Sequence, residues 1–412
     1  MSLLRKRAYH VQRLAGAITS QQVTATDQRN EIQMPYSSRL STGCKCGRGY
    51  AFATIFVMLV AIIPAACKVD ADSTTGTISS RQAQFSQIHI ASSDDIQKYD
   101  LVGEILNDEE VLGDIGMLAV VGEYVIVGDS YLSPAIHVIR RSDGLVAGQV
   151  GRPGEGPGEY MSVWRILPLD DNSFAVYDFV LRRFTSYSVE NMDASVQYQR
   201  LLFEGYPIGV GIVGDHFIAT GLFSQGRIQV ADQSGNPMRF IGSPPSGPRG
   251  TPVQVRQHAH HGVIATRPGS TQFVIANRYA DELEFFQLDN TEAILAKGPA
   301  DIHRVYKVKN NNGIPSMLLG ADARHGYLDV AASNKYVYAL FSGRKVDETN
   351  SIQCRTIHVY DWHGRLVRML ALNIDVTDIA VSQDDEYLYA VKNIPGPAVV
   401  VFDMGAEPHN SL

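Results

Sequence analysis

The chain is poor in cysteine and tryptophan, and it lacks the apolar periodicity of a long helix. Its 412 residues include 4 Cys and 2 Trp. A disulfide-stapled miniprotein is excluded, since such scaffolds are short and rich in Cys. Global disorder is excluded as well, because 45% of the residues are hydrophobic and only 19% are charged. The chain is therefore globular, and it is long enough for one large core or two modest ones.

Positive charge is scarce after the first fifty residues. Residues 1–50 hold eight Lys/Arg and two Asp/Glu, a balance of +6, whereas the whole chain carries -7, so the remainder carries -13. Affinity for nucleic acid comes mainly from basic side chains that neutralise phosphates, so we expect no nucleic-acid partner. The chain also lacks a GxSxG, P-loop, HExxH or dinucleotide fingerprint. These absences argue against the commonest enzyme classes.

One uncharged apolar run covers residues 51–66 (AFATIFVMLVAIIPAA). Its sixteen residues are short for a bilayer-spanning helix, which needs about 20. The run fits the hydrophobic region of a secretory signal, because Lys45 and Arg48 precede it and small residues end it. The sequence therefore predicts an exported protein, with residues 1–66 as an N-terminal extension and signal. Met34 would give this signal a conventional start, so residues 1–33 are interpreted as a mis-assigned start.

The run ends in Ala65-Ala66-Cys67, which resembles a bacterial lipobox. That resemblance implies that Cys67 is lipidated and becomes the first residue of the mature protein. The alternatives are an uncleaved signal anchor and a buried core segment. The lipoprotein and the signal anchor both predict a membrane-anchored protein of the bacterial cell envelope. Residues 67–97 are rich in Ser, Thr and Gln, and we interpret them as a polar tether.

After the tether the pattern is period-2 alternation, interrupted by Gly, Asp and Asn, which indicates an all-β chain. One short strand recurs six times, as in EYVIVGD, SFAVYD and QFVIAN. The aromatic residues that align the copies are Tyr124, Phe174, Phe217, Phe273, Tyr336 and Tyr387. They are 50, 43, 56, 63 and 51 residues apart, a spacing that suits a unit of four strands with loops.

Four antiparallel strands repeated six times predict a six-bladed β-propeller over residues 98–412. The sixth unit ends near Met404 and lacks an outer strand. We expect an N-terminal strand, Lys98 to Ile105 (KYDLVGEI), to supply it and to close the ring. Closure in this way removes two open sheet edges. The propeller is expected to be monomeric.

Three segments carry a family resemblance: GRPGEGPGEY (residues 151–160), YALFSGR (338–344) and IHVYDWHG (357–364). Together they resemble the TolB-like six-bladed β-propeller lipoproteins of bacterial cell envelopes, which are related to the NHL-repeat propellers. The resemblance runs from about residue 98 to residue 404. It implies an exported lipoprotein with a propeller fold, and it supplies no catalytic residues.

The loops between second and third strands open on the same face as the loops between blades. That face collects the long loops 151–160, 242–257 and 343–354, and long loops on a rigid scaffold commonly bind ligands. Arginines and a carboxylate there are candidates either to contact an anionic ligand or to brace the loops. These ligand-binding candidates are Arg152, Glu159, Arg182, Arg183 and Arg344.

His258, His260 and His261 are metal candidates, because a strand would place two of the imidazoles on one side. No partner carboxylate is identifiable, so no cofactor is predicted, with Ca²⁺ or Zn²⁺ as the alternative. Gly128-Asp129-Ser130-Tyr131 has the form of a GDS-type esterase motif, and Asp322 and His325 have the spacing of a base and its orienting acid. The six-fold repeat instead explains Gly128-Asp129 as the end of a blade strand.

The sequence favours a membrane-anchored propeller that binds a protein, peptide or glycan of the cell envelope on its long-loop face, without catalysis. The alternative is a metal-dependent six-bladed propeller enzyme of the lactonase or amidating-lyase type. That enzyme needs carboxylates and histidines that converge at the channel mouth. Fold alone does not decide between the two.

Overall fold

The computed structural model describes residues 80–81, 84–92, 96–109, 111–130, 133–192, 197–290 and 292–405. The chain divides into a unit of residues 1–67 and a unit of residues 68–412, and the structure described below belongs to the second. The signal and the lipobox with Cys67 lie outside the described residues. Within the described part, no helix is long and apolar enough to cross a bilayer.

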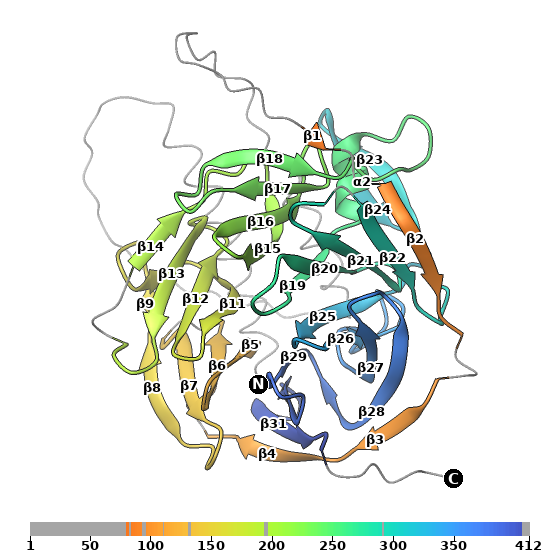
Figure 1. Ribbon diagram of the computed structural model, residues 1–412. Helices are drawn as coiled ribbons and strands as arrows, with labels where there is room; N and C mark the ends of the chain where they lie inside the picture. Colours follow the sequence, from red (N-terminus) through yellow and green to blue (C-terminus); the bar gives the residue numbers. More distant parts are fainter. Residues whose placement is uncertain are drawn as a thin grey trace, which may run out of the picture. The chain divides into compact units, whose positions relative to one another are not determined.

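Six small sheets stand around a central axis and form a six-bladed β-propeller (Figure 1). The first three blades contain β5 (Ile115–Val121), β6 (Tyr124–Asp129), β7 (Ile136–Arg140) and β8 (Val146–Val150); β11 (Val163–Asp170), β12 (Ser173–Asp178), β13 (Arg183–Ser188) and β14 (Gln197–Arg200); and β15 (Pro207–Val213), β16 (His216–Gly221), β17 (Ile228–Ala231) and β18 (Pro237–Ile241). The last three contain β19 (Gly262–Thr266), β20 (Gln272–Asn277), β21 (Glu282–Gln287) and β22 (Glu292–Lys297); β25 (Tyr327–Ala332), β26 (Tyr336–Phe341), β27 (Cys354–Asp361) and β28 (Leu366–Val376); and β29 (Asp378–Val381), β30 (Tyr387–Lys392), β31 (Ala398–Asp403) and β4 (Gly103–Asn107). The predicted fold class is confirmed.

The recurring hairpin strand of the sequence is the second strand of each blade. Each of the six aligning aromatic residues lies in β6, β12, β16, β20, β26 or β30. Most positions of these strands are buried in succession, as in β12 and β20. This follows from the architecture, because each blade is covered on both faces by its neighbours and a strand covered on both faces needs apolar residues at consecutive positions.

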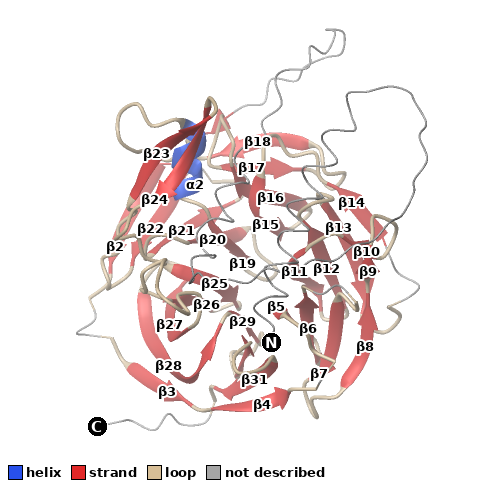
Figure 2. Cartoon of the chain, turned by 180° about the vertical axis from the view of Figure 1, so that it is seen from behind, coloured by secondary structure: helices blue, strands red, loops and turns tan. Residues whose placement is uncertain are grey.

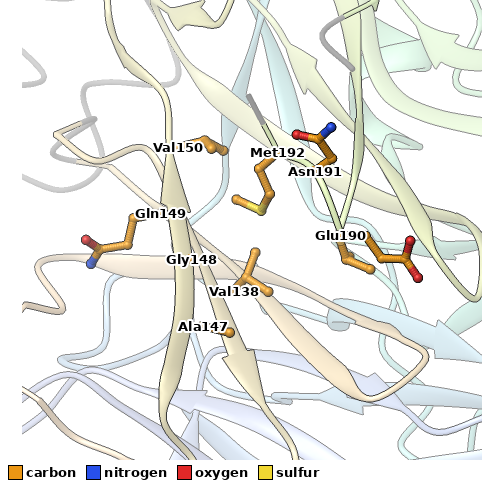
Figure 3. A pocket seen from close by; sticks show the side chains of 9 residues that line it. Val138, Ala147, Gly148, Gln149, Val150, Glu190, Asn191 and Met192 are labelled. Carbon is orange, nitrogen blue, oxygen red and sulfur yellow. The ribbon is translucent and has the colours of Figure 1, made fainter. Parts of the chain in front are cut away.

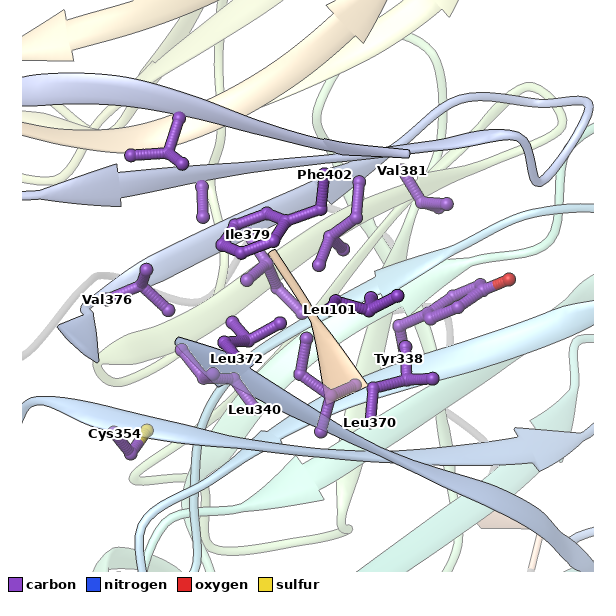
Figure 4. Packing of buried hydrophobic residues seen from close by; sticks show 14 of the residues in the cluster. Leu101, Tyr338, Leu340, Cys354, Leu370, Leu372, Val376, Ile379, Val381 and Phe402 are labelled. Carbon is purple, nitrogen blue, oxygen red and sulfur yellow. The ribbon is translucent and has the colours of Figure 1, made fainter. Parts of the chain in front are cut away.

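The hydrophobic core is divided among the contacts between neighbouring blades. Separate clusters of buried side chains fill each of the six blade-to-blade interfaces. In Figure 4, Leu340 and Leu370 of blade five face Ile379 and Phe402 of blade six, with Leu101 of the N-terminal segment between them. Stability is therefore distributed around the ring, and closing the ring buries the last interface.

The N-terminal segment runs along the outside of the ring as a belt, defined as β1 (Ser80–Arg81), β2 (Gln84–Ile90) and β3 (Lys98–Leu101). These strands pair in parallel with β18, β22 and β28, so they add a fifth strand to blades three, four and five. Figure 1 shows them in orange on the outer edges. β1 and β2 lie within residues 67–97, which the sequence assigns to a polar tether, so the described end of that segment is strand.

An N-terminal strand closes the ring as predicted, but the predicted segment Lys98 to Ile105 is divided between two blades. β3 pairs with β28 of blade five, whereas β4 pairs antiparallel with β31 and supplies the fourth strand of blade six. Between the two strands, at Val102, the chain leaves the sheet of blade five and joins the sheet of blade six. There, the side-chain oxygen of Asn373 accepts a hydrogen bond of 2.9 Å from the backbone N–H of Gly103.

Three insertions lie on the face of the long loops. β9 (Arg152–Pro153) and β10 (Glu159–Tyr160) pair within the loop between blades one and two. The helix α2 (Val253–Ala259) precedes blade four, and the hairpin of β23 (Tyr306–Asn311) and β24 (Ile314–Leu319) precedes blade five. Figure 2 shows α2 beside this hairpin. We call α2, β23, β24 and the loop of residues 343–353 the cap.

Candidate functional site

The channel mouth is the end of the propeller axis where the six inner strands begin. β5, β11, β15, β19, β25 and β29 are the innermost strands of their sheets, and each follows a loop that arrives from the previous blade. They therefore run in the same direction, and their first residues meet at one end of the axis, on the face of the long loops. A propeller offers a ligand its most concave surface at this place.

β-Bulges occur at the same position of four inner strands. In β11, Val163 faces Asp178 and Arg165 faces Tyr177, which leaves Trp164 as the extra residue. The equivalent extra residues of blades one, three and five are Met117, Ile208 and Leu328. A bulge re-aims side chains and occurs frequently beside functional sites. These four inner strands are therefore irregular at the end where a ligand would arrive.

A buried ion pair crosses the channel just below the mouth. Nη1 of Arg165, in blade two, lies 2.7 Å from Oδ1 of Asp329, in the opposite blade five. Nη2 of the same guanidinium donates to the backbone oxygen of Val330 at 3.1 Å. Oδ2 of Asp329 accepts the backbone N–H of Ile379 in blade six at 2.9 Å. This pair ties three blades together and obstructs the channel at this depth.

A second carboxyl group lies beside this pair. Oδ1 of Asp378, at the start of β29, accepts the backbone N–H of Met117 in blade one at 3.3 Å. Burial, and then the negative charge of Asp329, raise the pKa of Asp378 to about 6. Nη1 of Arg278, in the turn after β20, donates to the backbone oxygen of Leu328 at 3.2 Å. Charged side chains from blades two, four, five and six therefore gather just below the mouth.

Two aromatic rings form a shelf on the side of blade two that faces blade three. The aromatic shelf consists of Trp164 and Phe179. The ring centroids of Trp164 and Phe179 are 4.8 Å apart, and the indole Nε1 donates to the backbone oxygen of Ile208 at 2.9 Å. Trp164 is 36% exposed, so a fixed indole presents part of its surface to solvent. An exposed, immobilised Trp beside the channel is a typical ligand contact.

The structure brings three of the predicted ligand-binding residues together as a brace of the loop 151–160. Nε of Arg152 lies 2.9 Å from Oε1 of Glu159, whose Oε2 accepts the backbone N–H of Gly156. That backbone hydrogen bond, followed by the hydrogen bond from Arg152, lowers the pKa of Glu159. The buried guanidinium of Arg183 donates to the carbonyl oxygens of Glu155, Gly156 and Glu159. Their contacts within the protein hold the loop closed.

The other two predicted arginines lie apart from this brace. The guanidinium of Arg182 lies 4.9 Å from the centre of the Tyr206 ring, and Nη2 donates to the backbone oxygen of Gly205 at 3.0 Å. Arg182 therefore lies on the same segment, residues 205–208, that accepts the indole N–H of Trp164. Arg344 belongs to the cap, where Nη1 donates to the carbonyl oxygen of Asn350 and Nη2 lies 3.6 Å from Asp375.

The three histidines do not lie on a strand, and that expectation was wrong. His258 is in α2, and His260 is the residue that ends this helix. The helix forms because Val255 and Ala259 pack on Tyr279 and Met317 under the hairpin of β23 and β24. Burial lowers the pKa of His258 to about 4 and that of His260 to about 3, so both are neutral at pH 7. Among the described residues, no three His, Cys, Asp or Glu side chains are grouped for a metal.

The esterase-like segment serves the blades. Asp129 ends β6 and accepts the backbone N–H of Gly113 at 2.7 Å, and Asp178 ends β12 and accepts those of Met161 and Ser162. Each carboxylate therefore fixes the backbone just before an inner strand begins. Asp322, proposed as an orienting acid for His325, instead forms an exposed ion pair with Lys345 at 3.1 Å.

One pocket lies away from the channel mouth. It has a volume of about 330 Å³ and lies between β8 and the turn that follows β13. Figure 3 shows Val138, Gly148 and Met192 around it. Its position on the outer edge of blades one and two separates it from the mouth.

The match to a protein-family model agrees with this fold. A family model described as "TolB-like 6-blade propeller-like" matches residues 145–384. No curated protein sequence gives a significant match. Among solved structures, an exported protein of Bacteroides fragilis is 12% identical with a TM-score of 0.46, and the match covers 76% of this chain and 98% of that one. The structure of U3-55K is 10% identical with a TM-score of 0.44, covering 73% and 98%.

Proposed function

Because the chain belongs to the TolB-like six-bladed propeller family, we propose that it is an exported, membrane-anchored propeller that binds a protein, peptide or glycan without catalysis. The binding surface is the face that carries the channel mouth and the cap. One observation carries this proposal: the mouth presents the fixed, exposed indole of Trp164 above charged side chains from four blades. Binding sites combine apolar surface with a few oriented polar groups in this way.

The cap supports the same proposal, because its helix, hairpin and loop pack against one another. Val255 and Ala259 of α2 pack with Met317 of the hairpin, and Val346 of the loop 343–353 packs against them. Nη1 of Arg256 donates to the carbonyl oxygen of Pro245 at 2.9 Å, which ties α2 to the loop before it. A rigid structure beyond the needs of the ring keeps binding residues in place and lowers the entropy lost on binding.

Capture of partners from cell-envelope extracts tests the binding role. The full chain, immobilised in detergent, is compared with a variant that carries Trp164→Ala and Arg182→Ala at the mouth, and with a Phe85→Ala control on the outer strand β2. We expect ligands that the wild type and the control retain and the mouth variant loses. Equal retention by all three would place the binding surface elsewhere.

The export and anchoring part of the proposal depends on Cys67 and has its own test. We expect the wild type in the membrane fraction, with a lipid-modified Cys67 detected by mass spectrometry. Cys67→Ser should lose the modification and, if Cys67 is the anchor, should leave the membrane fraction. Unmodified wild-type Cys67 in a membrane-bound chain would favour the signal anchor.

The alternative of a metal-dependent enzyme is tested by native mass spectrometry with metal analysis of the full chain, purified without chelator. The proposal expects a metal-free protein. A stoichiometric Ca²⁺ or Zn²⁺ would contradict it and would direct work to lactone and peptide-lyase assays.

A further inference from the structure

We propose that the aromatic shelf is a carbohydrate subsite, on which the indole of Trp164 stacks against the C–H face of a pyranose ring. This inference rests on the proposed binding function and specifies its ligand class. Trp164 is the bulge residue of β11, so the irregularity that distinguishes the mouth places this large ring there. The corresponding residues of the other bulged blades are aliphatic: Met117, Ile208 and Leu328.

The hydrogen bonding of the indole favours a sugar ring over a peptide. Its Nε1 already donates to the backbone oxygen of Ile208, so Trp164 has no donor left for a peptide carbonyl. Phe179 covers part of the ring and holds its orientation. What remains for a ligand is the apolar ring surface.

A polar group for the hydroxyl rim of a sugar lies beside the shelf. Nη2 of Arg182 donates to the backbone oxygen of Gly205, and its other nitrogens donate to no described residue. A planar ring surface beside a guanidinium group matches a ligand with one apolar face and a polar edge.

Tryptophan fluorescence provides a direct test, because the chain has only 2 Trp. Trp362 is buried, and its Nε1 donates to the backbone oxygen of Ser333, so a bound ligand changes mainly the emission of Trp164. The probes are four trisaccharides, of glucose, mannose, N-acetylglucosamine and galacturonic acid, together with a proline-rich peptide. The full chain in a sugar-free detergent is titrated with each.

We expect saturable binding of at least one trisaccharide to the wild type and to the Phe85→Ala control. Trp164→Phe keeps a stacking ring and should bind more weakly, whereas Trp164→Ala should lose at least about tenfold in affinity, measured by calorimetry. Circular dichroism and thermal unfolding establish that the variants are folded. Binding of the peptide alone, sugar binding that Trp164→Ala leaves unchanged, or no sugar binding at all would each overturn the proposal. If envelope ligands still depend on the mouth, only the carbohydrate assignment fails.

Discussion

At the scale of single residues, the most consequential contact is the ion pair between Arg165 and Asp329. Both side chains are largely buried, and both were removed from water when the ring formed. Such a pair adds little stability compared with an apolar pair of equal volume. Removal of one partner, however, leaves the other charge buried and uncompensated. The two side chains come from opposite blades, so loss of the pair removes a contact that joins both sides of the channel.

Arg165→Ala is therefore expected to destabilise the fold by about 3–5 kcal/mol, because the carboxylate of Asp329 stays buried without its partner. Denaturant-induced unfolding, followed by circular dichroism, measures the change. Arg152→Ala is the control, since Arg152 forms an ion pair at the surface, where solvent screens it. Equal effects of the two substitutions would show that the channel pair has no special role.

A second prediction at the scale of residues concerns Asp378 and the dependence of stability on pH. Its pKa rises from 3.8 to about 6 in the folded chain, so the folded state binds the proton more tightly than the unfolded state. The stability that this proton contributes is fully present below pH 3.8 and is lost as the pH rises through about 6. Asp378→Asn keeps an acceptor for the backbone N–H of Met117 and does not titrate.

Relative to the wild type, Asp378→Asn should therefore gain stability between pH 4 and pH 7, by at most about 3 kcal/mol. Unfolding free energies of both proteins at several pH values give this difference directly, and the pH dependence that they share cancels. A difference that stays constant over this range would mean that Asp378 titrates normally.

At the scale of elements, the closing strand β4 is packed too tightly for a side chain at its first residue. A Cβ on Gly103 would lie 2.6 Å from Cε1 of Phe402 and 2.6 Å from Cγ1 of Val400. Both are buried side chains of blade six, so neither moves without disturbing the core between blades five and six. This glycine is required by close approach between strands.

Gly103→Val should therefore weaken ring closure and destabilise the protein by about 1–3 kcal/mol, the usual cost of overpacking. The midpoint of thermal unfolding, and hydrogen exchange in β4 and β31, measure this effect. Gly396→Ala is the matched control, because a Cβ there meets nothing within 4 Å. A Gly103→Val protein as stable as the control would show that β4 can shift without cost.

The elements were predictable from the sequence because each repeats a local pattern. The strand with Tyr124 or Phe174 carries its recurring pattern in six consecutive residues, and six copies specify the propeller. Arg165, Asp329 and Asp378 were not predicted as a site, because they are distant in sequence and meet only when the ring closes. A charge near the start of an apolar inner strand was the available signal for all three. The helix α2 was missed because it has only seven residues and its stability comes from packing under β23 and β24.

At the scale of the whole molecule, the belt and the closing strand β4 make separate contributions to stability. β2 pairs in parallel with β22 along the outer edge of blade four and leaves Phe85 and Ile88 exposed. β4 completes blade six and joins the two ends of the propeller. The belt covers edges that already belong to complete sheets, whereas β4 fills a gap.

A chain that begins at residue 92 lacks β1 and β2 and should still fold as a monomer, with a lower midpoint of thermal unfolding. A chain that begins at residue 109 also lacks β3 and β4, and it should be insoluble or aggregated because blade six has lost its outer strand. Size-exclusion chromatography and thermal unfolding distinguish these results. Equal behaviour of the two chains would show that β4 does not hold the ring closed.

The pairing of Gly103 with Phe402 also determines when blade six can be completed during synthesis of the chain. The ribosome makes β4 before any other strand of blade six and makes β31 last. A growing chain therefore carries an unpaired β4 and an incomplete ring until β31 has been added. Contacts between such distant residues form slowly, because a long loop must close first. The new chain thus leaves the edge of β4 exposed while blades one to five are made, and during that time it can pair wrongly or bind a chaperone.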